Sequence, residues 1–452
     1  MRGYTIVWSG QLVSLLGTGM KDFALVIWAW QLTGQATALA LVAFFAFAPT
    51  VILMPFAGVM VDRYDRKWIM ALTDATAGIA SLLILVLYLM HSLELWHVYG
   101  LVLFAGAFQA FQWPAFSAAT TMLVPKRHYG RANAMLTTAQ AASMVFSPIM
   151  AAVLLGIIDI SGILAIDVIT FLIALACLYS VPIPRPPVSV EGSEAGKTIW
   201  GKMAFGFSYI WERRPLLGLQ LILFFTNLVG TIGLTVLSPM ILAKTEDDAT
   251  MLGTVMTLAG IGGVVGGVAT AVWGVPHRKV RGLLAGLVVS GIGGVIVGMG
   301  RSLPIWAVGG FLYTVTWPLT NACNQSIWQS KVPPDLQGRV FATRGLIAMI
   351  GTPISQVIAG PMADLVLEPA FMDATGVPAA MVGSGPGAGM AMMVLISGIL
   401  ATLVGVVGYS FRSVREVETL LPDHVLAKED GEDEEGTEGD EGEGGHDGEG
   451  VD

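Results

Sequence analysis

The sequence predicts an all-α membrane protein whose twelve transmembrane helices form two pseudo-symmetric six-helix bundles. Three observations lead to this fold class. The 452 residues are 54% hydrophobic and only 13% charged, with a mean hydropathy of +0.70, whereas soluble domains carry about 25% charged residues. Apolar runs long enough to cross a bilayer as helices recur along the whole chain. The two halves of the chain also match one another at several short motifs.

The individual spans are defined by apolar runs of about 20 residues and by the short polar turns between them. A stretch rich in Pro, Ser and Gly divides six spans from six, and it ends in a short amphipathic segment at 199–211. The predicted spans, in chain order, cover residues 4–30, 37–60, 68–90, 97–124, 132–157, 161–181, 215–243, 250–274, 280–300, 304–330, 340–367 and 388–410. The predicted domains are an N-terminal bundle (1–181), a cytoplasmic linker (182–214), a C-terminal bundle (215–412) and an acidic cytoplasmic tail (413–452).

The tail carries much of the negative charge of the chain. Thirteen of the 33 Asp and Glu residues lie in 429–452, so the net charge of −9 says little about the membrane-embedded part. Residues 429–452 include almost no apolar residues, and we therefore expect the tail to be disordered. A solubilising role is the simplest interpretation, with cation buffering or docking to a basic partner as alternatives.

The distribution of basic residues predicts the orientation in the membrane. If the N-terminus lies in the cytoplasm, 21 of the 24 Lys and Arg residues fall on cytoplasmic segments. Cytoplasmic loops of membrane proteins carry such an excess of basic residues. We therefore expect a multi-pass protein of the cytoplasmic (inner) membrane with both termini in the cytoplasm.

An internal repeat relates the two halves. The segment LVPKRHYGRANA (123–134) matches KVPPDLQGRVFA (331–342) at an offset of 208. Two further pairs match at an offset of 205, namely Pro148 with Pro353 and Asp159 with Asp364. Parallel six-span repeats, with a substrate site between the halves near the middle of the bilayer, are typical of secondary transporters.

The most informative motif is GVMVDRYDRK (58–67), a short charged turn between two spans. It resembles the loop signature G-x-x-x-D-R-x-x-R-K of the major facilitator superfamily, and the resemblance covers residues 1 to about 412. Together with Asp74, VPKRHYGRANA (124–134), IDVITF (166–171) and WGVPHRK (273–279), the motif is similar to the efflux branch that includes macrolide and enterobactin exporters. The resemblance implies the major facilitator fold and the activity of a drug:proton antiporter.

The charged turn supplies a candidate cytoplasmic gate. The resemblance implies that Asp62 contacts the inner start of span 11 and holds the cytoplasmic side closed. A carboxylate is stabilised by a helix N-terminus and by nearby cations. A topology signal in a solvated loop is the alternative interpretation, but it does not account for Gly58 and Asp62. The candidate gate residues are Gly58, Asp62, Arg63, Arg66, Lys67, Arg339 and Arg344.

Four ionisable residues inside the predicted spans are candidates for proton or ion coupling, because intramembrane charges usually face a cavity or a partner. Lys21 and Asp22 lie in span 1, with Asp22 as the best candidate and a structural ion pair as the alternative. Asp74 lies near the inner start of span 3, where bracing of the charged turn is the leading interpretation. Asp167 lies near the outer end of span 6, where bracing of the turn after Asp159 is an equal alternative.

Neutral polar residues recur at helical spacing on several spans and predict the wall of a substrate cavity. The resemblance implies that spans 1, 4, 7 and 10 line the central cavity. Neutral groups mixed with tryptophan suit a large, amphipathic, uncharged or weakly charged ligand, and interhelical hydrogen bonding is the alternative role for about half of them. The candidates are Gln11, Thr18, Gln109, Gln112, Gln140, Asn227, Thr231, Asn321, Asn324 and Trp328.

These observations predict a secondary active exporter rather than an enzyme. It would move an amphipathic small molecule, such as a drug, a macrolide or a siderophore, out of the cytoplasm by alternating access, and the resemblance implies protons as the coupling ion. We expect a monomer in the lipid bilayer with no cofactor, no metal and no nucleic-acid partner. The alternatives are an importer or lysolipid flippase on the same fold, and a non-transporting scaffold or sensor that uses the acidic tail.

Overall fold

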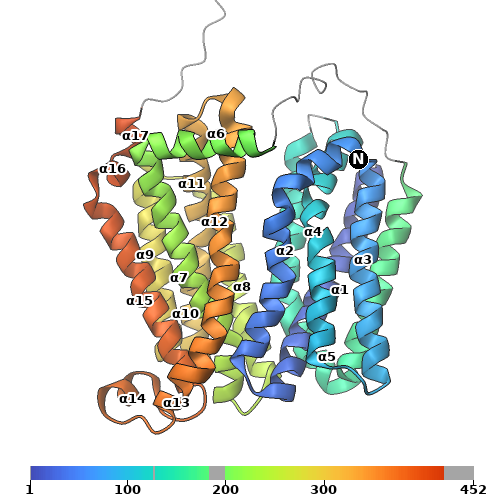
Figure 1. The fold of residues 1–452 in the computed structure, drawn as a ribbon, viewed down its shortest axis with the longest axis vertical. Helices are drawn as coiled ribbons and strands as arrows, with labels where there is room; N and C mark the ends of the chain where they lie inside the picture. The colour runs from blue at the N-terminus through green and yellow to red at the C-terminus, as the bar shows by residue number, and fades with distance from the viewer. Residues whose placement is uncertain (1, 126–127, 183–198, 422–452) are drawn as a thin grey trace, which may run out of the picture.

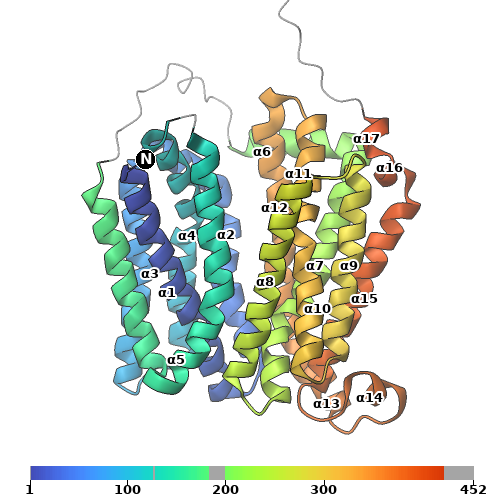
Figure 2. The same cartoon turned by 180° about the vertical axis from the view of Figure 1, so that it is seen from behind.

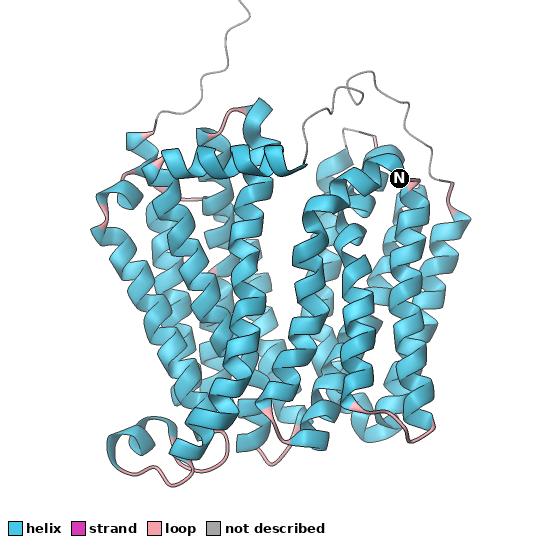
Figure 3. Cartoon of the chain, viewed as in Figure 1, coloured by secondary structure: helices cyan, strands magenta, loops and turns pink. Residues whose placement is uncertain are grey.

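The computed structural model describes residues 2–125, 128–182 and 199–421, and every regular element within them is helical (Figure 3). Nine of the described helices are long and apolar enough to cross a membrane by length and composition. The predicted all-α membrane fold is therefore confirmed, while the count of twelve crossings stays a prediction.

The N-terminal bundle follows the predicted spans within a few residues. Its last helix covers predicted spans 5 and 6 together, joined at Asp159, whose φ of 57° and ψ of 178° are not helical. The Asp159 carboxylate accepts a hydrogen bond from the Tyr88 hydroxyl at 2.8 Å, which fixes this turn to a neighbouring helix. The helices of this bundle are α1 (Arg2–Thr33), α2 (Ala36–Arg63), α3 (Arg66–Leu89), α4 (Leu95–Leu123) and α5 (Tyr129–Ser180).

The C-terminal bundle also follows the predicted spans, with one break. Predicted span 10 (304–330) consists of two helices that meet at Thr316, because Pro318 has no backbone N–H to continue the hydrogen-bond ladder. The helices of this bundle are α7 (Arg214–Lys244), α8 (Ala249–Trp273), α9 (Lys279–Met299), α10 (Leu303–Val315), α11 (Trp317–Lys331), α12 (Pro334–Met362) and α15 (Ala388–Ser410).

Short elements complete the chain. The amphipathic segment predicted at 199–211 forms α6 (Ile199–Glu212), and residues 183–198 of the predicted linker lie outside the described residues. Beyond α12 the chain makes a π-helical turn η3 (Ala363–Leu367), α13 (Glu368–Phe371) and α14 (Gly376–Val382). After α15 come α16 (Arg412–Arg415) and α17 (Val417–Leu420).

The two bundles lie side by side, and α6 lies across one end of the C-terminal bundle (Figures 1 and 2). We call that end, which also carries the N-terminus and α17, the α6 end. The opposite end, which carries α13 and α14, is the α14 end.

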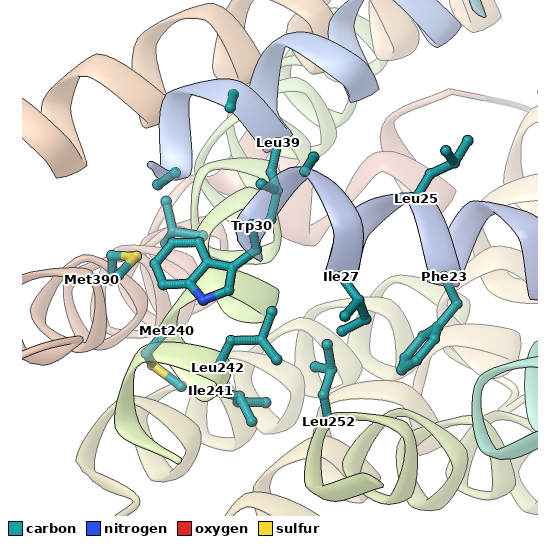
Figure 4. Packing of buried hydrophobic residues seen from close by; sticks show 14 of the residues in the cluster. Phe23, Leu25, Ile27, Trp30, Leu39, Met240, Ile241, Leu242, Leu252 and Met390 are labelled. Atoms are coloured by element: carbon teal, nitrogen blue, oxygen red, sulfur yellow. The ribbon is translucent and has the colours of Figure 1, made fainter. Parts of the chain in front are cut away.

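Three buried apolar clusters of the described residues hold the helices together, and one of them joins the bundles. This shared cluster lies at the α14 end, where Trp30 of α1 packs with Met240 of α7 and Met390 of α15 (Figure 4). The other two clusters lie toward the α6 end and each contain residues of one bundle alone. The bundles therefore share a core at the α14 end and have separate cores at the α6 end.

The beginning of the predicted disordered tail is ordered. The carboxylate of Glu418 in α17 accepts hydrogen bonds from the backbone N–H groups of Lys279 and Val280, both at 3.2 Å, and so caps α9. The Lys331 ammonium donates to the carbonyl oxygens of Glu418 and Leu421, both at 2.6 Å. The prediction of disorder from residue 413 is thus wrong for the first residues, because these contacts anchor them, and residues 422–452 lie outside the described residues.

Candidate functional site

A half-buried carboxyl in the N-terminal bundle is held by two glutamines. Gln11 of α1 donates through Nε2 to one oxygen of Asp74 on α3 at 3.0 Å, and Gln112 of α4 donates to the other at 2.9 Å. Gln112 also donates to Gln11 Oε1 at 3.3 Å and accepts a hydrogen bond from the Thr73 hydroxyl. Within the described part of the chain no cation pairs with Asp74. Gln11 and Gln112 were predicted to line a cavity, and Asp74 was predicted to couple protons or to brace the charged turn. The structure brings these three residues together in one cluster between α1, α3 and α4.

A second polar cluster lies further along α1. The Lys21 ammonium lies 3.6 Å from Asp167 Oδ2 on α5, and the Ser81 hydroxyl donates to the same oxygen at 2.6 Å. Thr18 donates to Asp167 Oδ1 at 3.2 Å. The Lys21 and Asp167 side chains are only 11% and 4% exposed, so this is a buried ion pair. Ten residues separate Gln11 from Lys21, which places the two clusters about 15 Å apart along α1.

Asp22, the best coupling candidate from sequence, occupies the edge of this second cluster. Its carboxylate lies 3.7 Å from the Lys21 ammonium, but its side chain is 66% exposed. Lys21 thus faces two acids, one buried on α5 and one exposed on its own helix. The ion pair between Lys21 and Asp167 joins α1 to α5. This partner of Asp167 was not predicted from the sequence.

The C-terminal bundle holds a half-buried arginine without an acidic partner among the described residues. Arg344 donates through Nη2 to Gln325 Oε1 at 2.9 Å, and its guanidinium lies 5.3 Å from the ring centroids of Trp328 and Phe341. Its Nη1 atom is buried and has no hydrogen-bond partner in the described residues. Trp328, predicted to line a cavity, is instead fully buried beside this guanidinium.

The remaining cavity candidates differ in exposure. Asn324 is buried and its Oδ1 atom lacks a hydrogen-bond partner in the described part of the chain. Thr231 is half-buried and accepts at its carbonyl a hydrogen bond from Thr235. Four candidates on α4, α5, α7 and α11 are exposed, namely Gln109, Gln140, Asn227 and Asn321.

The predicted gate residues lie at the α6 end. Gly58, Asp62 and Arg63 occupy the last turns of α2, and their side chains lie outside the described part of the structure. Arg66 begins α3. The Lys67 ammonium donates to the carbonyl oxygens of Tyr179 and Val181 at 3.1 and 2.8 Å, so it ties the start of α3 to the end of α5. Arg339 lies 5.7 Å from the Phe205 ring of α6.

At the α14 end, polar contacts connect the bundles directly. The Asp364 carboxylate accepts hydrogen bonds from the backbone N–H groups of Ala36 and Thr37 at 2.9 and 2.8 Å, and so caps the first turn of α2 from the other bundle. Trp30 donates through Nε1 to Asp247 at 2.6 Å. A further contact between the bundles lies on the face of the molecule seen in Figure 2, where α8 passes α5. There the Thr257 hydroxyl of α8 donates to the Val145 carbonyl of α5 at 2.9 Å.

Close packing supports the same junction between α2 and α12. A Cβ atom added to Gly360 would lie 2.6 Å from the Cα atom of Thr37 and 3.0 Å from the Cβ atom of Ala40. Contacts that short require a shift of backbone, so only glycine allows the two helices to approach this closely. The α14 end is therefore closed by hydrogen bonds, by a shared apolar core and by direct backbone contact.

An apolar cavity of about 560 Å³ lies between the same two helices, on the side of this contact that faces the α6 end. Its α2 wall consists of Phe44, Ala48, Val51, Ile52, Pro55 and Phe56. Its α12 wall consists of Leu346, Ile350, Pro353, Ile354, Val357 and Ile358. Both walls are entirely apolar, and both helices are visible at the front of Figure 1.

Paired helical bundles with apolar surfaces, buried polar clusters and a cavity between the halves define a multi-pass membrane transporter rather than an enzyme. A family model described as Major Facilitator Superfamily matches residues 7–356. The chain belongs to the major facilitator superfamily.

Relatives and solved structures agree with this assignment. Macrolide efflux protein A of Streptococcus pyogenes is 26% identical over 376 residues, which cover 80% of this chain and 90% of the relative. The enterobactin exporter EntS of Salmonella choleraesuis is 21% identical over 387 residues, covering 84% and 90%. A bacterial homologue of the human lysosomal transporter Spinster has the same fold, with a TM-score of 0.66 at 14% identity over 92% of this chain and 97% of the other. A bacterial homologue of the iron transporter ferroportin has a TM-score of 0.65 at 15% identity, covering 90% and 98%.

Several residues of the α14 end escaped prediction. The only sequence feature noted for Asp364 was its match with Asp159 in the internal repeat. No sequence pattern indicated that Trp30 and Asp247 would form a contact between the bundles. In the structure Asp364 lies close to Pro361 and in a π-helical turn, and such turns are frequent at functional sites.

Proposed function

We propose that this protein exports amphipathic small molecules across the inner membrane by alternating access, driven by proton entry. The observation that carries the proposal is the asymmetry of the bundle contacts. A core shared at the α14 end and separate cores at the α6 end are what a carrier requires when it is closed on one side and accessible from the other. The excess of basic residues favours the α6 end as the cytoplasmic side.

The side chains that line the cavity between α2 and α12 support an amphipathic substrate. The cavity between α2 and α12 is lined only by apolar side chains, while the exposed candidates Gln109, Gln140 and Asn227 are neutral and polar. Such surroundings accept a molecule with a large apolar part and a few hydrogen-bonding groups. Relatives named for the efflux of macrolides and the export of enterobactin point in the same direction.

Asp74 is the carboxyl that we assign to proton coupling, with Asp22 as the second candidate. Asp167 is already neutralised by Lys21, and a proton there would break a buried ion pair. Asp74 has amide partners on both oxygens instead. A proton can therefore bind to Asp74 and leave it without disrupting an ion pair. When the proton binds, one carboxylate oxygen of Asp74 changes from a hydrogen-bond acceptor to a hydroxyl donor.

The gate assignment completes the cycle. We assign Asp62 to an interaction with Arg339 or Arg344 in the state that is closed at the α6 end. Arg344 supports this assignment because its Nη1 atom is buried without a hydrogen-bond partner, and no acid pairs with the guanidinium among the described residues. A buried charge of this kind is costly unless a partner arrives during the cycle.

Transport of erythromycin into inverted membrane vesicles tests the proposal. With an acid interior, export in the cell corresponds to accumulation in the vesicle, and the wild-type protein should accumulate the drug. Asp74→Asn should bind erythromycin but lose accumulation driven by the proton gradient, and Asp22→Asn should retain it. Accumulation only in right-side-out vesicles would indicate an importer, and accumulation by Asp74→Asn with unchanged pH dependence would exclude Asp74 as the coupling group.

A further inference from the structure

Thr73 lies beside the Asp74 carboxyl and has two acceptors for one hydrogen. Its hydroxyl oxygen lies 2.9 Å from the Met70 carbonyl oxygen of its own helix, and it also contacts Gln112 Oε1 on α4. A hydroxyl carries a single hydrogen, which it donates to one acceptor at a time. The Thr73 side chain is 2% exposed, so its partners come from the protein. The hydroxyl therefore has two alternative hydrogen bonds, one to the backbone of α3 and one to Gln112.

The choice between these two bonds is linked to the orientation of the Gln112 amide. While Thr73 donates to Gln112 Oε1, the Nε2 atom of the amide donates to Asp74 Oδ1 at 2.9 Å and to Gln11 Oε1 at 3.3 Å. An ionised carboxylate only accepts hydrogen bonds, so it requires this orientation. A protonated Asp74 has a hydroxyl donor and can pair with the reversed amide, whose Oε1 accepts from Asp74 while Nε2 donates to Thr73. In that arrangement the Thr73 hydrogen is donated to the Met70 carbonyl.

We propose that Thr73 is a positioning residue that sets the orientation of the Gln112 amide and so supports the ionised form of Asp74. When Asp74 takes up a proton, the Thr73 hydroxyl rotates to Met70. This inference rests on the assignment of Asp74 to proton coupling in the proposed function. Reversal of the amide also removes the hydrogen bond from Gln112 to Gln11, so protonation releases the direct bond between α1 and α4. Proton uptake thereby changes which helices of the bundle are bonded to one another.

The protonation state of Asp74 is controlled by these neutral partners. No hydrogen bond or ion pair joins Asp74, Thr73 or Gln112 to another titratable side chain among the described residues. The Lys67 ammonium is bonded to backbone carbonyls at the end of α5, and Lys21 pairs with Asp167. The titratable side chains on either side of the cluster are Tyr4 and Lys21 on α1, Lys67 and Tyr88 on α3, Tyr99 on α4, and Asp167 and Cys177 on the second half of α5.

Thr73→Val tests the positioning role, because valine keeps the shape of threonine and removes the hydroxyl. The ionised carboxylate accepts one orientation of the Gln112 amide, and in this variant that orientation leaves Gln112 Oε1 without its donor. The ionised form therefore loses more than the protonated form, and the pH at which half of Asp74 carries a proton should rise by about one unit. Thr73→Ser keeps the hydroxyl and should restore the wild-type value.

Thr76→Val is the matched control. Thr76 lies one turn further along α3 and is 4% exposed. Its hydroxyl donates to the Thr73 carbonyl at 2.9 Å, three residues earlier, just as Thr73 can donate to Met70. It has no hydrogen bond to Gln112 among the described residues, so the protonation of Asp74 should be as in the wild type.

Infrared difference spectroscopy of the full-length protein in liposomes measures this protonation directly. The carbonyl stretch of a protonated carboxyl that disappears in Asp74→Asn identifies the group, and its amplitude is followed across pH. Equal midpoints in the wild type and Thr73→Val would overturn the proposal. If Asp74→Asn removes no such band at any pH, both the positioning role of Thr73 and the coupling role of Asp74 are wrong.

A double variant shows whether Thr73 acts through Gln112. Gln112→Leu removes the amide, so adding Thr73→Val to it should shift the midpoint no further, whereas an additive shift would contradict the proposal. Erythromycin accumulation in inverted vesicles separates this inference from the proposed function. A raised midpoint in Thr73→Val, together with no accumulation by the wild-type protein, would support the positioning role and contradict export.

Discussion

The Asp364 carboxylate accepts a hydrogen bond from the Thr37 backbone N–H at 2.8 Å, so an acid of the C-terminal bundle caps a helix of the N-terminal bundle. The negative group lies at the positive end of the α2 dipole, and hydrogen bonds to charged groups contribute more than neutral ones. This contact stabilises the state that is closed at the α14 end. It must break whenever that end opens.

Asp364→Asn should therefore favour opening of the α14 end. The amide keeps the shape of the side chain but loses the charge and one acceptor, at a cost of about 2 kcal/mol, which corresponds to roughly a thirtyfold change in the population ratio. Spin labels at the exposed positions Gln35 and Met372 should report a longer distance by double electron–electron resonance. Asp159→Asn is the control, because Asp159 bonds only to Tyr88 of its own bundle in the described residues, and its distance distribution should stay as in the wild type.

Gly360→Val should produce the same opening by steric means. The added side chain would meet the Thr37 backbone at 2.6 Å, a contact that cannot be relieved by rotating a side chain. Gly345→Val, on the same helix, is the control, since a Cβ atom there meets nothing within 4 Å. Equal distances between the Gln35 and Met372 labels in both valine variants would show that close approach at Gly360 is not required for closure.

The buried Lys21–Asp167 pair should contribute to stability as a unit. Asp167→Asn leaves the Lys21 ammonium without its buried partner and should destabilise the protein by about 3 kcal/mol, whereas the double variant Lys21→Met with Asp167→Asn should recover part of the loss. Asp22→Asn should change stability by less than about 1 kcal/mol, because its side chain is 66% exposed. Thermal unfolding in detergent compares the wild type with Lys21→Met, Asp167→Asn, their double variant and Asp22→Asn. Additive effects of Lys21→Met and Asp167→Asn in the double variant would argue against coupling.

Arg344 should be needed for transport more than for folding. Arg344→Gln removes one of the two cations that we assign to Asp62, so export of erythromycin should fall at least tenfold. Arg344→Lys keeps the positive charge and should retain part of the export. Arg412→Gln is the surface control, since Arg412 is 77% exposed and pairs with Glu416. Full export by Arg344→Gln, with normal size-exclusion behaviour, would remove Arg344 from the gate.

The fold was predictable because each span depends on a local property of the chain. A run of about 20 apolar residues must become a helix in a bilayer, whatever surrounds it. The break at Thr316 and the joined helix α5 were not predicted, because hydropathy does not register where a Pro interrupts the hydrogen-bond ladder or where a turn is short. The order of α16 and α17 was missed because it depends on contacts of Glu418 and Lys331 that are distant in sequence.

The polar sites were predictable only as residue types. Asp74, Gln11 and Gln112 each stood out as polar residues within an apolar span, but which of them meet depends on how α1, α3 and α4 pack. Trp328 illustrates the limit, since an aromatic residue on a helix can line a cavity or fill a core, and here it fills a core beside Arg344. The contacts at the α14 end involve backbone groups of α2, which leave no signature in the sequence.

The apolar cluster around Trp30 has a consequence for how the two halves depend on each other. Because residues such as Met240 and Met390 bury their surface against α1 of the other half, neither half has a complete interior by itself in this state. The twofold repeat of six spans therefore does not correspond to two separate apolar cores at the α14 end. Loss of structure in one half would expose the apolar residues of the other half that pack in this shared cluster.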